Sequence, residues 1–181
     1  MSASTLSRLE RAIAQRNPLL LHVLQPGLTE LEIMSAINKA GMNGDLRAIL
    51  EVYHWRNGMD PRSQLSLLES SLFPKSIYQF LSLQNAIEMY KTLQQAADDL
   101  AAITGDPTGI SRSVKQCFPL FWDGSNCSLG VGLTPGAQNP VVMINFGNTE
   151  PFCEVYRAFE EFLEDVARAN EENDRLKCFH L

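Results

Sequence analysis

Cysteine and histidine side chains are the residue types in this chain with the greatest capacity for metal binding and nucleophilic chemistry. They are Cys117, Cys127, Cys153 and Cys178, with His22, His54 and His180. The cysteines are widely spaced with no Cys-x-x-Cys pair, and the histidines show no His-x-x-x-His spacing. Because zinc and dithiol redox sites use such short spacings, we expect no metal, no cofactor and free thiols.

Motifs of common enzyme classes are also missing from the sequence, including the Gly-x-Ser-x-Gly elbow and the phosphate-binding loop. Gly130-Val131-Gly132 lies inside a predicted strand with no helix after it, which favours strand packing over a dinucleotide-binding turn. Asp98 and Asp99 are neighbours on a predicted helix and do not share a face, so we interpret them as a solvated edge. We therefore predict that the protein is not an enzyme and has no catalytic residue.

Acidic residues are concentrated at the C-terminal end of the chain. The net charge is −6, and residues 150–181 hold nine acids and four bases, whereas the rest of the chain holds twelve and eleven. An acidic chain without a basic patch is poorly suited to phosphate backbones, so we expect no nucleic-acid partner. The same field would attract a basic protein, although acidity also simply keeps a protein soluble.

Part of this acidity recurs at helical spacing on a helix that the sequence predicts over about 152–173. The candidate partner-binding stripe comprises Glu154, Glu161, Asp165 and Glu172, opposite an apolar stripe. A line of this kind is usually the solvated side of an amphipathic helix, and docking of a partner is the alternative. The pairs Arg157–Glu161, Glu164–Arg168 and Glu171–Arg175 are spaced i,i+4, so we expect some of the charge to be paired locally.

Helical periodicity predicts further helices over 4–16, from a Thr29–Glu32 capping box, from near Asp45, and over 83–103. Strands are predicted over 78–81, 118–123, 127–133 and 141–146, with a hairpin turn at 123–126. Strands joined by such short links run antiparallel. The order of elements predicts an α+β fold, an antiparallel sheet with N-terminal, central and C-terminal helices packed on one face.

The length of 181 residues favours one domain. We predict an appended N-terminal helix over 1–22, a single α+β domain over 23–173 and a short polar tail over 174–181. No apolar run is long enough to cross a membrane, so no membrane partner is expected. The N-terminal residues lack a basic region followed by an apolar stretch, which predicts a cytoplasmic protein.

Four segments in a fixed order resemble the SUKH superfamily, the group of the yeast cell-wall assembly regulator (Smi/Knr-like) and of bacterial toxin-immunity proteins. The first is Gly27-Leu28-Thr29-Glu30-Leu31-Glu32-Ile33, and the second covers residues 46–58 and ends in Tyr53-His54-Trp55-Arg56-Asn57-Gly58. The third is Leu72-Phe73-Pro74, and the fourth is Phe80-Leu81-Ser82-Leu83-Gln84-Asn85-Ala86. The resemblance covers residues from about 27 to 166. Where the family often has a Leu-Pro pair before the third helix, this chain has Gly44-Asp45-Leu46.

The resemblance implies a SUKH-like α+β domain that binds another protein and has no catalytic residue. In bacteria such proteins often neutralise a cognate toxin, for example a basic nuclease, and a regulatory or scaffold role that binds host proteins is the alternative. The matching residues Trp55, Asn57, Gly58, Phe73 and Pro74 are expected to be structural. Trp55 would be a core or groove anchor, and Asn57-Gly58 would support a turn with positive φ. The partner's identity and the oligomeric state stay open.

Overall fold

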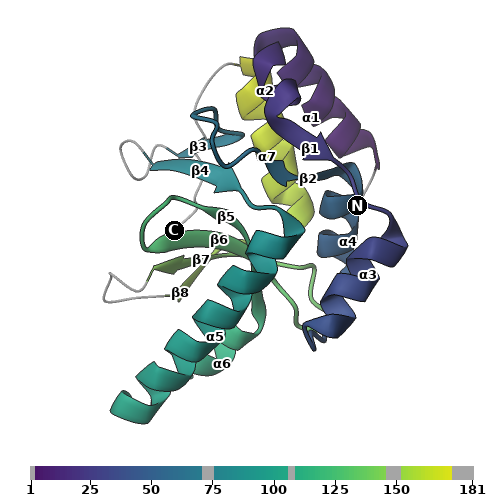
Figure 1. Cartoon of the computed structure of the whole chain (residues 1–181). Coiled ribbons are helices and arrows are strands. Elements are labelled where there is room, and N and C mark those ends of the chain that lie inside the picture. The colour runs from purple at the N-terminus through teal and green to yellow at the C-terminus, as the bar shows by residue number, and fades with distance from the viewer. Residues whose placement is uncertain (1–2, 71–75, 106–108, 146–151, 173–181) are drawn as a thin grey trace.

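The computed structural model of the chain describes residues 3–70, 76–105, 109–145 and 152–172 (Figure 1). The helices are α1 (Ala3–Arg16), α2 (Pro18–Val23), α3 (Glu30–Lys39), α4 (Arg47–Trp55), α5 (Leu83–Thr104), α6 (Ile110–Lys115) and α7 (Phe159–Glu172). The strands are β1 (Leu24–Pro26), β2 (Arg56–Met59), β3 (Leu68–Ser70), β4 (Ser76–Phe80), β5 (Cys117–Trp122), β6 (Cys127–Gly132), β7 (Val141–Asn145) and β8 (Phe152–Tyr156). The predicted α+β class, with N-terminal, central and C-terminal helices on an antiparallel sheet, is confirmed.

The main sheet is an antiparallel meander with the strand order β3-β4-β5-β6-β7-β8. Strands β5 to β8 follow one another through short links, whereas α5 and α6 are inserted between β4 and β5. The predicted hairpin turn joins β5 to β6, and Asp123 Oδ1 accepts hydrogen bonds there from the amides of Ser125 and Cys127 at 2.8 and 3.1 Å. Strands β1 and β2 form a separate two-stranded antiparallel sheet.

Strand β8 is a correction to the predicted C-terminal helix, which begins at Phe159 and not at residue 152. Phe152–Tyr156 instead pairs antiparallel with β7, and Glu154 lies opposite Val142. The apolar residues of this segment fit a helical stripe and a half-buried strand almost equally well, so periodicity alone does not separate the two. The free edge of β7 decides the outcome, because pairing there satisfies the backbone of both strands.

Helices cover both faces of the main sheet, and not one face as the sequence predicts. Side chains alternate along β7, so that Val141 and Met143 belong to the main core while Val142 and Ile144 join a smaller cluster with α5 and α6. Helices α1, α4 and α7 contribute to the main core (Figure 1). The unbroken apolar run over Val141–Ile144 is the sequence pattern of a strand that is buried on both faces.

Helix α1 packs along α7, its neighbour in Figure 1 although the two lie at opposite ends of the chain. Leu6, Leu9 and Ile13 are buried in the same core as Phe159 and Phe162 of α7. The N-terminal helix thus shares its core with the predicted domain 23–173. Helices α2 and α6 are short and were not predicted; α2 begins at Pro18, whose fixed φ suits a first helical turn.

Two of the segments that carry the family resemblance meet at the start of α5. The Tyr53 hydroxyl donates to the Leu81 carbonyl oxygen at 3.1 Å, and Asn57 Oδ1 accepts from the Leu83 amide at 2.9 Å. Gly58 has the expected positive φ of 78°, but it lies in strand β2 against the backbone of Ser82 and not in an open turn. The two segments thus stabilise each other, because side chains of the first form hydrogen bonds with the backbone of the second.

Within the described part of the chain, no helix is long and apolar enough to cross a lipid bilayer. Cys117 and Cys127 are buried free thiols, and burial raises the pKa of Cys117 to about 12. Cys178, Phe73 and Pro74 lie outside the described residues.

Candidate functional site

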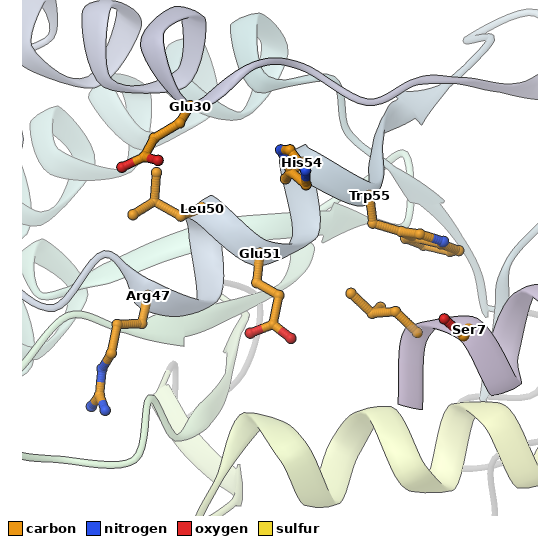
Figure 2. Close-up of a pocket in the computed structure, with 8 residues that line it drawn as sticks. Ser7, Glu30, Arg47, Leu50, Glu51, His54 and Trp55 are labelled. Carbon is orange, nitrogen blue, oxygen red and sulfur yellow. The ribbon is translucent and has the colours of Figure 1, made fainter. Parts of the chain in front are cut away.

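An open groove with a volume of about 600 Å³ runs along helix α4 (Figure 2). Three helices line it: α1 with Leu6 and Ser7, α3 with Glu30, and α4 with Arg47, Leu50, Glu51, His54 and Trp55. A smaller hollow of about 320 Å³ shares Arg47 and Glu51 with it and extends to Asn139, Phe159 and Glu160. The two hollows therefore adjoin at Glu51, where α4 faces the beginning of α7.

Helix α4 presents two different faces. Ala48, Ile49, Val52 and Tyr53 are buried in the core, whereas Arg47, Leu50, Glu51 and His54 line the groove. Residues spaced by three and four lie on one side of a helix, so the second set forms a continuous outward stripe. Leu50 and Glu51 in this stripe are half-buried, and Arg47 and His54 are exposed.

Polar contacts with α7 fix helix α1 beside the groove. Arg8 forms a two-pronged ion pair with Glu171, with Nε to Oε1 at 2.7 Å and Nη2 to Oε2 at 2.6 Å, and its Nη1 lies 2.6 Å from Glu164 Oε2. The buried Thr5 hydroxyl lies 2.8 Å from Glu160 Oε1 and 2.7 Å from Glu164 Oε1. Such two-pronged arginine contacts define an orientation as well as an attraction, so they determine how α1 presents Leu6 to the groove.

Trp55 closes one end of the groove and is held by a carboxylate of α1. Its indole Nε1 donates to Glu10 Oε2 at 2.9 Å, and Arg56 Nη2 lies 2.6 Å from the other oxygen of the same carboxylate. Trp55 is only partly buried, and its ring stays available on the groove side. Trp55 thus packs against the main core and also lines the groove, so both of the predicted positions apply to it.

The charges of the groove are unevenly compensated. Arg47 Nε donates to Asp45 Oδ1 at 2.9 Å, and this hydrogen bond lowers the pKa of Asp45. Glu51, in contrast, makes no ion pair among the described residues. Burial raises the pKa of Glu51 above its usual value of 4.5; the positive charge of the chain's N-terminus opposes this, and the neighbouring Glu160 carboxylate adds a smaller increase.

Residue types that can act as nucleophile, base and acid occur together in the groove, in Ser7, His54 and Glu51. Figure 2 shows the His54 imidazole and the Glu51 carboxylate pointing away from each other along the outward face of α4, and Ser7 lies away from both on α1. A nucleophile triad needs these groups within hydrogen-bond reach of one another. The arrangement is thus better suited to contact with a ligand than to proton transfer. No three His, Cys, Asp or Glu side chains group as a metal site among the residues that the structure describes.

The structure distributes the four predicted acidic residues over two elements. Glu154 is exposed on strand β8, whereas Glu161, Asp165 and Glu172 lie on α7. Asp165 accepts a hydrogen bond from the Tyr156 hydroxyl at 3.2 Å and is paired with Arg168 at 2.5 Å. The predicted single helical stripe is therefore wrong for Glu154, although Glu161 and Glu172 remain exposed on the helix.

The predicted local pairing of acids along α7 also differs from the structure. Arg168 pairs with Asp165 three residues earlier, and Glu164 and Glu171 pair with Arg8. Arg175 lies outside the described residues. Sequence spacing identifies partners on the same helix only, and here the closer cation is supplied by a helix more than 150 residues away in the chain.

Searches against protein-family models and against curated proteins found no match to this chain. Glu51, Arg47 and Glu30 were not singled out by sequence analysis, but a signal was present. Leu50 is an apolar residue beside the charged residues on the outward side of an amphipathic helix, a position where polar residues are typical.

Replacement of Arg8 by alanine should lower the free energy of unfolding by about 1 kcal/mol at neutral pH, a value discounted for the partial exposure of the ion pairs. The Arg8 hydrogen bond lowers the pKa of Glu171 below 4.5, so this stabilisation is present above that pH and is lost as the pH falls through the folded-state pKa. Urea unfolding at several pH values measures it. The exposed Arg62→Ala variant is the control, and an Arg8→Ala effect that persisted unchanged in acid would contradict the ion-pair explanation.

Proposed function

We propose that this chain is a non-catalytic protein-binding module that uses the α4 groove, and that it binds and neutralises a cognate toxin in the cytoplasm. The observation that carries the proposal is the composition of the groove. Leu50 and Trp55 are partly exposed and offer apolar surface beside the charged groups of Glu30 and Glu51, and Leu6 lines the same groove although it is only 5% exposed. An apolar centre with a polar rim is typical of protein interfaces, and tryptophan is enriched among their energetic anchors.

The toxin-binding role is supported by the order of the segments that resemble immunity proteins and by the chain's net charge of −6, which favours a basic partner. The groove is built in part by two of those segments, since Glu30 belongs to the first and the α4 residues to the second. The exposed acids Glu161 and Glu172 extend the negative field on α7, and their role as a docking stripe remains a second, separate prediction.

Co-expression with the toxins encoded beside this gene tests the proposal. We expect one of them to be lethal alone and harmless with this protein, and the two proteins to co-purify as a stoichiometric complex. The toxin recovered from the complex should have an unchanged mass, because binding without catalysis leaves it intact. Failure to rescue growth against every neighbouring toxin would contradict the immunity role, and recovery of host envelope-assembly proteins instead would favour the regulatory alternative.

A further inference from the structure

Glu51 is placed where an uncompensated carboxylate is unfavourable. It is half-buried on α4, and burial raises its pKa although the positive charge of the chain's N-terminus acts in the opposite direction; the Glu160 carboxylate adds a smaller increase, and Arg47 beside it is engaged by Asp45. A raised pKa means that the ionised form costs stability, a cost absent below the ordinary value of 4.5 and fully present above the folded-state pKa. The N-terminal charge does not cancel this cost, since the pKa of Glu51 is still raised, so a cation supplied by a binding partner would reduce it further at neutral pH.

We propose that the α4 groove receives a lysine or arginine of the partner protein on Glu51, together with an adjacent aliphatic residue on Leu6, Leu50 and Trp55. The proposal rests on the proposed protein-binding function and specifies the chemistry of the partner segment. Figure 2 shows the Glu51 carboxylate directed between Arg47 and Ser7 of α1, with Trp55 on the next turn of α4 and the adjacent Leu50 directed toward Glu30.

The geometry favours this occupant over an acidic or a purely apolar segment. An acidic side chain would meet Glu51 and Glu30 in the groove and Glu160 in the adjoining hollow, and the guanidinium of Arg47 already forms an ion pair with Asp45. A purely apolar segment would bury Glu51 further without supplying a charge, at a cost that burial of an unpaired ion always carries. A basic residue next to an aliphatic one would pair with Glu51 and would also pack against the apolar residues of the groove.

Short synthetic peptides of equal length test the inference directly with the full-length protein. One combines leucine with lysine, one leucine with glutamate, and one serine with lysine, and calorimetric titration measures each dissociation constant. We expect only the leucine–lysine peptide to bind well. Glu51→Gln should weaken that binding at least about tenfold, because a charge pair is replaced by a neutral contact. Glu88→Gln, at an exposed position of α5, should leave it unchanged.

Glu51→Gln must remain folded for this comparison, and it should be at least as stable as the original chain at neutral pH, since it removes the unfavourable charge. Leu50→Ser provides a second variant that should weaken the peptide through the apolar half of the groove. Equal binding of the leucine–glutamate peptide, or equal losses in Glu51→Gln and Glu88→Gln, would overturn the inference. So would a loss in Glu161→Gln with Glu51→Gln unaffected, since that result places docking on α7.

The peptide experiment tests the groove inference and the toxin experiment tests the immunity role, so either proposal can be overturned without the other. Selective peptide binding that depends on Glu51 supports the groove chemistry even if no neighbouring toxin is neutralised, which would overturn the immunity role alone. Toxin rescue that survives Glu51→Gln and Leu50→Ser, with no selective peptide binding, overturns the groove inference and leaves the immunity role in place.

Discussion

Substitution of Gly58 by alanine should lower the free energy of unfolding by about 3 kcal/mol or more, because two separate costs coincide there. The backbone φ of 78° is one that side chains rarely adopt. A Cβ atom would also come within 2.3 Å of the Ser82 amide nitrogen and 2.6 Å of the Leu81 carbonyl carbon. Neither backbone atom can move easily, since Tyr53 and Asn57 tie Leu81 and Leu83 to the same junction. Chemical denaturation with circular dichroism measures the loss.

Gly124 offers a matched control for this substitution. Its φ of 81° is nearly the same as that of Gly58, but a Cβ atom added there would meet no neighbouring atom within 4 Å. Gly124→Ala should therefore cost only the backbone strain, about 1 kcal/mol. Equal losses in the two variants would show that the close approach of β2 to the start of α5 contributes nothing.

Removal of residues 1–22 should leave a chain with little or no stable folded population. Leu6, Leu9 and Ile13 are 5%, 1% and 0% exposed. Burial of three aliphatic side chains contributes on the order of 5–9 kcal/mol, which is comparable with the total stability of a typical domain. Truncation would also uncover Phe159 and Phe162 on α7. Urea unfolding of residues 23–181 beside the full chain measures the difference.

A point substitution separates packing from chain length in this experiment. Leu9→Ala should cost about 3 kcal/mol, as expected for a fully buried leucine, whereas Gln15→Ala on the exposed side of α1 should change little. A truncated chain as stable as the full one would instead support the predicted boundary at residue 22, with the helix merely appended. Because Leu6 and Ser7 line the groove, a folded truncation should also lose binding of the leucine–lysine peptide.

Local signals in the sequence determined most helices and turns of this protein. Thr29 and Glu32 form the predicted capping box, with the Thr29 amide donating to Glu32 Oε2 at 2.8 Å. Ser82 begins the long helix α5, and Gly105 ends it in a left-handed conformation. These features involve residues within four positions of each other, so the physical interaction and the sequence signal are the same thing.

Tertiary structure alone decided where the C-terminal charges and the candidate site lie. The choice of strand for Phe152–Tyr156 depended on the edge of β7, and the neutralisation of Glu164 and Glu171 depended on Arg8 of α1. The groove likewise combines residues of α1, α3 and α4, which no spacing in the sequence relates. The sequence showed that acidic groups were in excess, whereas the fold determined that one of them, Glu51, is half-buried without a cation among the described residues. Long-range pairing is the reason, because a carboxylate's partners are set by whichever elements the core brings together.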